Sequence, residues 1–179
     1  IAARGARRFT ARALAREVGV TDGALFRHFA SMEEVVAAAV ARMEAVLFAA
    51  PAPAAGDPIE RLGIFFRDRV AVLTAHPHLA RLLFSDHLAQ LGGDDPARRI
   101  EGFKVRTRDF IAACLEEARR RRLLAAGLGP REGAVIVQGS VFALGHGGAT
   151  EKTTKAVWRA LERLLRGAGQ EGSEGRRTR

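Results

Sequence analysis

Apolar residues recur three or four positions apart along most of this 179-residue chain, and Gly or Pro interrupts the pattern at intervals. This spacing gathers apolar side chains on one face of a helix, whereas no stretch alternates as a strand would. The pattern therefore predicts an all-α fold. The expected helices cover residues 11–17, a short segment from residue 21, then 31–49, 57–75, 77–91, 96–124, 130–145 and 150–166.

The first two helices are short and close together. Thr10 and Thr21 precede them and are good N-caps, and Gly19 between them supplies the backbone freedom that a tight turn needs. Ala15 lies four residues before this glycine, and Leu25 lies six residues after it. A small residue, a glycine and an apolar residue at these intervals are typical of a helix-turn-helix, a motif that reads DNA.

A third helix follows directly. Ser31 and Glu34 have the spacing of a capping box, in which each side chain satisfies a backbone N–H of the first turn. Apolar residues then continue at helical spacing from Val36 to Leu47. The stretch PAPAAGDP at 51–58 cannot continue a helix, so we expect a linker there and a domain boundary near residue 50.

Three segments in this order, FTARALAREVGV, TDGALFRHF and SMEEVV, resemble the DNA-binding domain of the TetR/AcrR family of bacterial transcriptional regulators. The resemblance covers about the first quarter of the chain. It implies an all-α fold with an N-terminal helix-turn-helix DNA-binding domain and a C-terminal helical ligand-binding and dimerisation domain. We expect these domains at residues 1–50 and 51–167, with a disordered tail at 168–179 and a first helix whose earlier turns precede Ile1.

The resemblance also implies the residues that contact DNA. The helix from Thr21 is the expected recognition helix in the major groove, and the expected DNA contacts are Thr10, Thr21, Asp22, Gly23, Ala24, Leu25, Phe26, Arg27 and His28. The family usually has a tyrosine where this chain has Phe26 and a lysine where it has Met32. Both usual residues donate to phosphates, so we expect weaker non-specific DNA binding and a shallower salt dependence. Base readout is expected to rely on thymine methyl groups, Arg27 and DNA shape.

The later helices suggest a dimer and a ligand pocket. The helices near 130–146 and 151–166 occupy the positions that form the family's dimer interface, although the small residues in the first of them also fit a close crossing within one chain. Helices from 57 to 146 are expected to enclose an apolar pocket for a small hydrophobic effector. The candidate lining residues are Phe66, Phe84, His87, Phe103, Phe110, Gln138, Phe142 and His146. Each aromatic residue among them fits ordinary core packing better than a pocket, whereas Gln138 and His146 fit a pocket and a hydrogen-bonded core position equally well.

Composition is consistent with a nucleic-acid partner. The formal net charge is +9, with six arginines in residues 1–31 and nine Lys and Arg residues against four acids in residues 98–122. Arg4, Arg7 and Arg8 are either an arm toward DNA or a solvated face. The single cysteine, Cys114, excludes an internal disulfide and is expected to be buried. No apolar run is long enough for a membrane span, so a cytoplasmic protein is expected.

Enzymatic readings find little support. The pair His76 and His78, together with His87, lacks a cysteine or a clear carboxylate partner for a metal, and the surroundings of Ser140 are not a nucleophile elbow. We therefore predict a non-enzymatic, homodimeric repressor without a cofactor, which binds a palindromic operator in double-stranded DNA and releases it when an effector binds. The alternatives are a helical DNA-organising or protein-interaction factor without an effector, and an all-α enzyme that uses the histidines.

Overall fold

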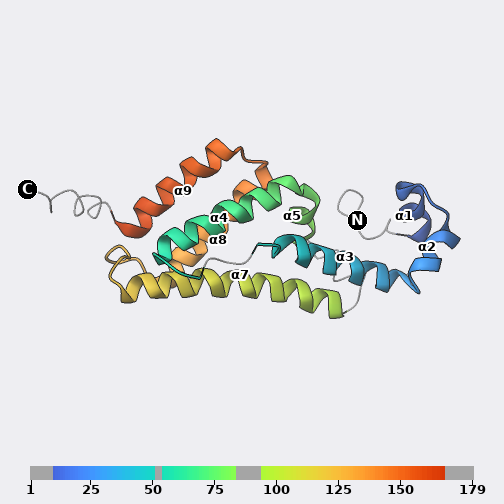
Figure 1. The fold of residues 1–179 in the computed structure, drawn as a ribbon, viewed down its shortest axis with the longest axis horizontal. Helices are drawn as coiled ribbons and strands as arrows, with labels where there is room; N and C mark the ends of the chain where they lie inside the picture. Colours follow the sequence, from blue (N-terminus) through green and yellow to red (C-terminus); the bar gives the residue numbers. More distant parts are fainter. Residues whose placement is uncertain (1–9, 51–53, 84–93, 168–179) are drawn as a thin grey trace, which may run out of the picture. The chain divides into compact units, whose positions relative to one another are not determined.

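The computed structural model describes residues 10–50, 54–83 and 94–167, and these residues form helices joined by short turns (Figure 1). The predicted all-α class is confirmed. The helices are α1 Ala11–Val18, α2 Asp22–His28, α3 Met32–Leu47, α4 Pro58–Ala75, α5 Pro77–Leu83, α7 Asp94–Arg120, α8 Pro130–Gly147 and α9 Glu151–Arg166. Several predictions concern residues outside the described ranges, namely Arg4, Arg7, Arg8, Phe84, His87, the second half of the 77–91 helix and the tail at 168–179.

The N-caps predicted from the sequence are present. The Thr10 hydroxyl accepts a hydrogen bond from the Ala13 N–H at 3.2 Å, and the Thr21 hydroxyl accepts one from the Ala24 N–H at 3.1 Å. Ser31 caps α3 in the same way, and the Glu34 carboxylate accepts from the backbone N–H of Ala30. These bonds satisfy N–H groups that have no partner inside the helix, so each helix begins where its cap stands.

The helix predicted for 96–124 ends earlier, at Arg120. The end is set by Arg122, which has a φ of 59° and is the only non-glycine residue of the described chain in the left-handed region. Its N–H donates to the Arg119 carbonyl at 3.0 Å, and the Leu123 N–H donates to the Ala118 carbonyl at 2.8 Å. This pair of bonds is the Schellman arrangement that terminates a helix, and here an arginine occupies the position that glycine usually takes.

The described residues fall into two compact units. The first unit combines residues up to 50 with 76–105, and the second combines 51–75 with the residues from 106 onward. Residue 50 thus ends the N-terminal segment of the first unit, and residues 76–105 form its second segment. Helix α7 contributes its residues up to 105 to the first unit and its residues from 106 to the second.

The core of the second unit lies between α4, α8 and α9. Phe66 on α4 is completely buried, and its ring centroid lies 5.3 Å from that of Trp158 on α9. Glycines allow the close approach of these helices. A Cβ atom at Gly63 would come within 2.5 Å of the Trp158 indole, and one at Gly145 of α8 would come within 2.8 Å of Leu73 on α4.

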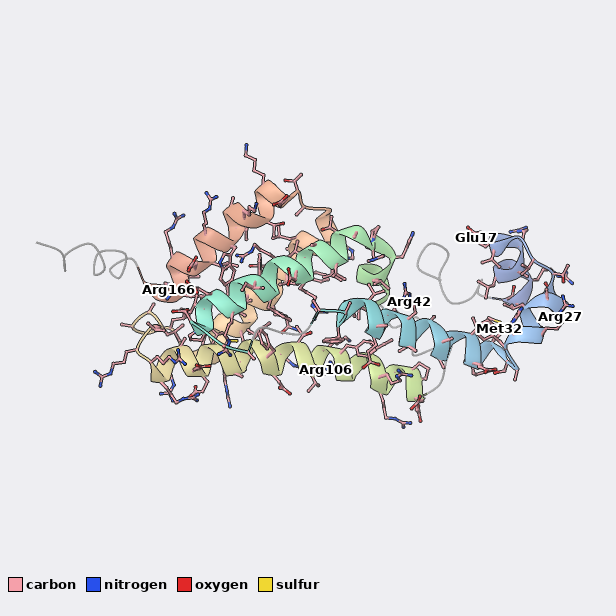
Figure 2. The ribbon with its side chains drawn as sticks, viewed as in Figure 1. Glu17, Arg27, Met32, Arg42, Arg106 and Arg166 are labelled. Carbon is pink, nitrogen blue, oxygen red and sulfur yellow. The ribbon has the colours of Figure 1, made fainter. Side chains whose placement is uncertain are left out.

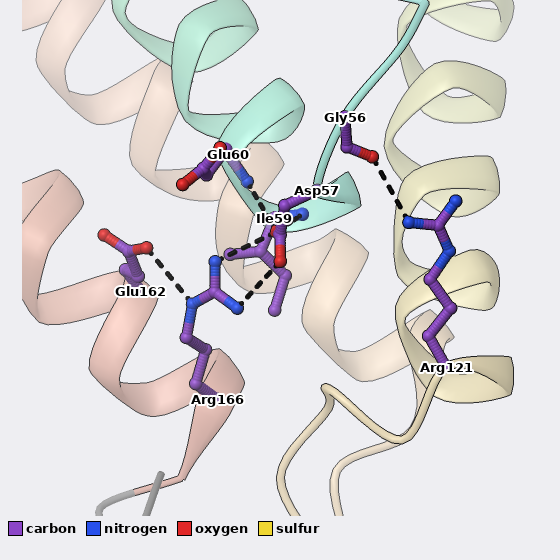
Figure 3. A network of polar contacts seen from close by, with 7 residues as sticks. All are labelled: Gly56, Asp57, Ile59, Glu60, Arg121, Glu162 and Arg166. Carbon is purple, nitrogen blue, oxygen red and sulfur yellow. Dashed lines mark hydrogen bonds and ion pairs between the residues drawn. The ribbon is translucent and has the colours of Figure 1, made fainter. Parts of the chain in front are cut away.

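A polar network ties the start of α4 to the end of α9 (Figure 3). Asp57 accepts two hydrogen bonds from the Arg166 guanidinium, at 2.9 and 3.2 Å, and caps α4 by accepting from the N–H groups of Ile59 and Glu60. Burial alone would raise the pKa of Asp57, but the bonds from Arg166 and from the two backbone N–H groups outweigh it, so this pKa lies below its ordinary value. Arg121 at the end of α7 donates to the Gly56 carbonyl at 3.3 Å.

Candidate nucleic-acid interface

The first two helices pack as a helix-turn-helix. Gly19 ends α1 with a φ of 75°, and the Val20 N–H donates to the Ala15 carbonyl at 2.9 Å, so the chain reverses within two residues. Ala15 is 1% exposed and Leu25 is 7% exposed. The small side chain and the apolar anchor therefore lie on the inner side of the motif, as their spacing predicts.

The outer side of α2 carries the groups that can meet DNA. Thr21, Gly23, Phe26, Arg27 and His28 are exposed, whereas Asp22 and Ala24 are half-buried. Leu25 anchors α2 and leaves little surface for a partner. A Cβ atom at Gly23 would meet nothing within 4 Å, so this position has no packing partner in the chain.

Thr10 and Thr21 are suited to phosphate contacts because of how their caps are made. Each hydroxyl oxygen accepts a backbone N–H, which leaves its own O–H to donate outward to a phosphate oxygen. Both threonines are exposed, at the starts of α1 and α2. Helix N-termini also favour an anion through their oriented N–H groups.

Charge on this surface comes from a few side chains. Arg27 and His28 lie in the last turn of α2, and Met32 begins α3 just beyond them (Figure 2). Arg12 on α1 lies 3.9 Å from the Asp22 carboxylate, but the Arg12 side chain is 90% exposed and that of Asp22 is 47% exposed, so this ion pair is weak. Asp22 also places a negative charge at the start of α2, the expected recognition helix, where it stabilises the helix and lowers its attraction for phosphate.

The described candidates for an effector pocket lie in separate environments. Phe66 packs on Trp158, and the Phe110 ring centroid lies 4.6 Å from that of Phe65, both within the second unit. Phe103 is 3% exposed and belongs to the first unit. On α8, Gln138 is half-buried, while Phe142 and His146 are exposed and stack on each other at 5.3 Å. Phe84 and His87 lie outside the described residues.

Among the described residues of the second unit, two surface pockets lie between α4 and α9. One, of about 480 Å³, is lined by Glu60, Ile64, Arg67, Lys155, Trp158, Arg159 and Glu162. The other, of about 530 Å³, shares Arg67 and Lys155 with it and continues toward Thr74 and Ala149. Their rims carry both signs of charge, and the predicted pocket residues do not line them.

A buried cation in the second unit escaped the sequence prediction. Arg69 on α4 is 8% exposed, and its guanidinium carbon lies 5.1 Å from the centre of the Phe65 ring. Burial, together with the like charge of Arg106, lowers the pKa of Arg69 to about 10. The signal was in the sequence, because Arg69 falls four residues after Phe65 and seven after Leu62, on the apolar stripe of α4.

Cys114 has a charged neighbour. The Arg61 guanidinium lies 3.6 Å from the Cys114 sulfur and donates to Glu117 at 2.8 Å. Burial raises the pKa of the Cys114 thiol above its ordinary value, although the Arg61 charge opposes this. The cysteine is 1% exposed and sits in the core of the second unit, as its apolar neighbours predict.

Metal-ligand clusters and membrane-spanning helices are both absent from the described parts of the chain. Among these residues, no three His, Cys, Asp or Glu side chains converge as metal ligands would. Nor does any described helix have both the length and the apolar character that crossing a bilayer requires.

Comparison with known proteins gives one sequence match and several fold matches. Residues 1–39 match the family described as bacterial regulatory proteins, tetR family. No curated protein matches the chain. A TetR transcriptional regulator from Streptomyces coelicolor A3 is 23% identical, with a TM-score of 0.71 over 92% of this chain and 84% of that chain.

Two further solved structures share the fold. The ketosteroid transcriptional regulator KstR2 of Mycobacterium tuberculosis is 18% identical, with a TM-score of 0.70 over 93% of this chain and 89% of that one. AibR, solved in complex with isovaleryl coenzyme A and operator DNA, is 17% identical, with a TM-score of 0.71 over 93% of this chain and 91% of that one. At these identities the likeness establishes the fold alone.

Proposed function

We propose that this chain, a TetR-family transcriptional regulator, acts in the cytoplasm as a homodimeric repressor that binds a palindromic operator and releases it when a hydrophobic effector binds. The observation that carries the proposal is the helix-turn-helix of α1 and α2, with Thr21, Arg27 and His28 exposed on the helix that follows the turn. Two copies would present two such helices to successive turns of the major groove, which makes the operator palindromic.

The DNA-binding part is tested by selecting genomic fragments on the full chain and sequencing them across a salt titration. We expect a palindromic site that is retained at salt concentrations that remove bulk DNA. Arg27→Ala should lower operator affinity by about tenfold, because Arg27 is the one long donor on the outer side of α2. Arg120→Ala removes the same charge from an exposed site in the second unit and should leave affinity nearly unchanged. Binding that is blind to sequence would overturn the operator proposal.

A second copy of this chain is proposed to bind the outer face of α8 and form the dimer. Val135 is 72% exposed and Phe142 is 39% exposed, and the exposed Gly139 between them allows another helix to come close. Val135→Glu should convert the dimer to a monomer in sedimentation experiments, because it buries an unpaired carboxylate at the contact. Ile64→Glu is the control, since Ile64 is also apolar and is 42% exposed, but it lies on α4 and lines the surface pocket beside α9. Unchanged mass for Val135→Glu would place the interface elsewhere.

The effector is proposed to be an acyl compound with an anionic group. Phenylalanines in the second unit favour an apolar compound, and the Arg69 guanidinium over the Phe65 ring places a cation beside them. Isovaleryl coenzyme A is the first compound to titrate, because the AibR structure contains it. Trp158, the only tryptophan of the chain, reports binding in the second unit by fluorescence.

The effector experiment compares two arginines. We expect Arg69→Met to weaken the titration by about tenfold, whereas Arg159→Met on the exposed side of α9 should not. Release of the selected operator by the same compound is the second readout. If a series of acyl thioesters changes neither fluorescence nor operator binding, this effector class is wrong, and the protein-interaction factor becomes the better description.

A further inference from the structure

We infer that Glu44 and Arg99 are positioning residues for DNA reading, through which helix α7 sets the place of α3 and therefore of the recognition helix. This inference rests on the proposed function. Glu44 lies on α3 and Arg99 lies on α7. The two residues are 55 positions apart in the sequence, so the pair is a long-range contact between two helices. The first 50 residues are therefore held by a segment that the domain boundary near residue 50 would assign to the effector domain.

The contact between α3 and α7 has a charged part and an apolar part. The Arg99 guanidinium donates to the Glu44 carboxylate at 2.9 Å, with the two side chains 39% and 33% exposed. One turn further along each helix, the Phe48 and Phe103 rings meet edge to face, with centroids 6.0 Å apart. These side chains are about half as exposed as those of the Asp95–Arg98 pair, so solvent screens this ion pair less.

From α3 the constraint reaches α2 within a few residues. The chain passes from His28 to Met32 through a short turn. In this turn the Phe29 N–H donates to the Leu25 carbonyl at 3.2 Å, and the Glu34 carboxylate on α3 accepts from Ala30. A displacement of α3 therefore moves the end of the recognition helix with it.

The other part of α7 is held in the second unit. There Phe110 stacks on Phe65 of α4 at 4.6 Å, and Glu117 accepts from Arg61 of α4 at 2.8 Å. One continuous helix thus contributes contacting residues to each unit.

The test uses charge reversal in the full chain. Glu44→Arg and Arg99→Glu change the net charge in opposite directions, so a general electrostatic effect on DNA would strengthen binding in one variant and weaken it in the other. A positioning role predicts instead that both reversals lower the ratio of operator to bulk-DNA affinity by about fivefold, and that the doubly swapped protein, with the original net charge, recovers it. Arg99→Lys, which keeps the charge, should retain most of the affinity ratio.

The matched control is a second ion pair on the same stretch of α7. Arg98 and Asp95 lie 3.5 Å apart, and both side chains are 70% exposed. Arg98→Glu and Asp95→Arg make the same charge changes without touching α3. Their effects on operator affinity should follow charge alone, with opposite signs.

A readout without DNA keeps the inference separate from the proposed function. Amide hydrogen exchange of residues 32–47 should be faster in each single reversal and return to normal in the swap, with residues 130–147 as the internal reference. If exchange does not respond, or if it responds while the operator affinity ratio stays constant, the positioning role is wrong. If the unaltered chain has no operator, the proposed function fails, and the exchange pattern still decides whether this ion pair holds α3.

Discussion

The α-carbon of Gly63 faces the indole of Trp158 so closely that a Cβ atom at this position would lie 2.5 Å from Cε2 and 2.6 Å from Nε1. Gly63→Ala therefore forces α4 and α9 apart or turns the tryptophan. We expect a loss of about 2 kcal/mol in unfolding free energy, beyond the small gain in helix propensity. Denaturant unfolding followed by Trp158 fluorescence measures it.

Gly102→Ala on α7 is the control for this substitution. A Cβ atom there meets nothing within 4 Å. Helix propensity alone predicts a gain of up to about 1 kcal/mol in stability. Equal effects of the two substitutions would show that the approach of α4 to Trp158 is looser than the structure has it.

Arg122 offers a stabilising substitution. Its φ of 59° costs a non-glycine residue about 1 kcal/mol, and glycine adopts this conformation without strain. We expect Arg122→Gly to raise unfolding free energy by about 0.5–1 kcal/mol in denaturant unfolding followed by circular dichroism. Arg120→Gly removes the same charge from the last turn of α7 and should lower stability by about 1 kcal/mol. A loss of stability with Arg122→Gly would mean that the side chain contributes more than the strain.

The positions of the helices could be predicted from the sequence because N-cap residues and turn glycines act locally. Thr10, Thr21 and Ser31 cap helices where their types predict, and Gly19 takes the left-handed conformation of the turn. The end of α7 could not be predicted, because Arg122 rather than a glycine adopts the left-handed conformation that terminates the helix. Membership of residues 76–105 in the first unit depends on long-range contacts such as Arg99 with Glu44, which no local pattern encodes.

Acid should weaken the ion pair between Asp57 and Arg166. Because the folded-state pKa of Asp57 is lowered, its stabilising effect is complete above the unfolded pKa of about 4 and disappears as pH falls through the folded value. Asp57→Asn keeps the α4 cap but loses the charge. We expect it to cost about 1 kcal/mol at pH 7 and progressively less below pH 4, in denaturant unfolding at a series of pH values.

The comparison for this prediction is Asp95→Asn. Asp95 forms an exposed ion pair with Arg98, and solvent screens it. Its substitution should change stability little at either pH. If the Asp57→Asn difference stays constant down to pH 2, the carboxylate charge of Asp57 does not stabilise the fold.

Adding the phosphate donors that the family resemblance implies at positions 26 and 32 should strengthen DNA binding. Phe26 is 44% exposed on α2, and Phe26→Tyr adds a hydroxyl without changing the ring. Met32→Lys adds a cation at the start of α3 and should steepen the dependence of log affinity on log salt by about 1. Filter-binding titrations over a salt series measure both. Ala126→Lys, in an exposed turn of the second unit, adds the same charge and should leave the slope unchanged.

For the predicted effector residues, the sequence pattern could not distinguish a pocket from a packed core. An aromatic residue on an apolar stripe has the same pattern whether it lines a pocket or fills a core, and Phe66 is completely buried against Trp158. Arg69 lies on the same stripe of α4, and its burial over the Phe65 ring was not predicted from the sequence.

The boundary between the two units runs through the middle of a helix, since α7 has residues in both. A hybrid regulator made by joining residues 1–50 to the body of another protein would leave Glu44 and Phe48 facing helices that evolved without them. A chimera that preserves the α3–α7 contacts needs two further crossovers, one near residue 76 and one inside α7 near residue 105. Transferring the first unit to another protein therefore requires two pieces of the gene rather than one.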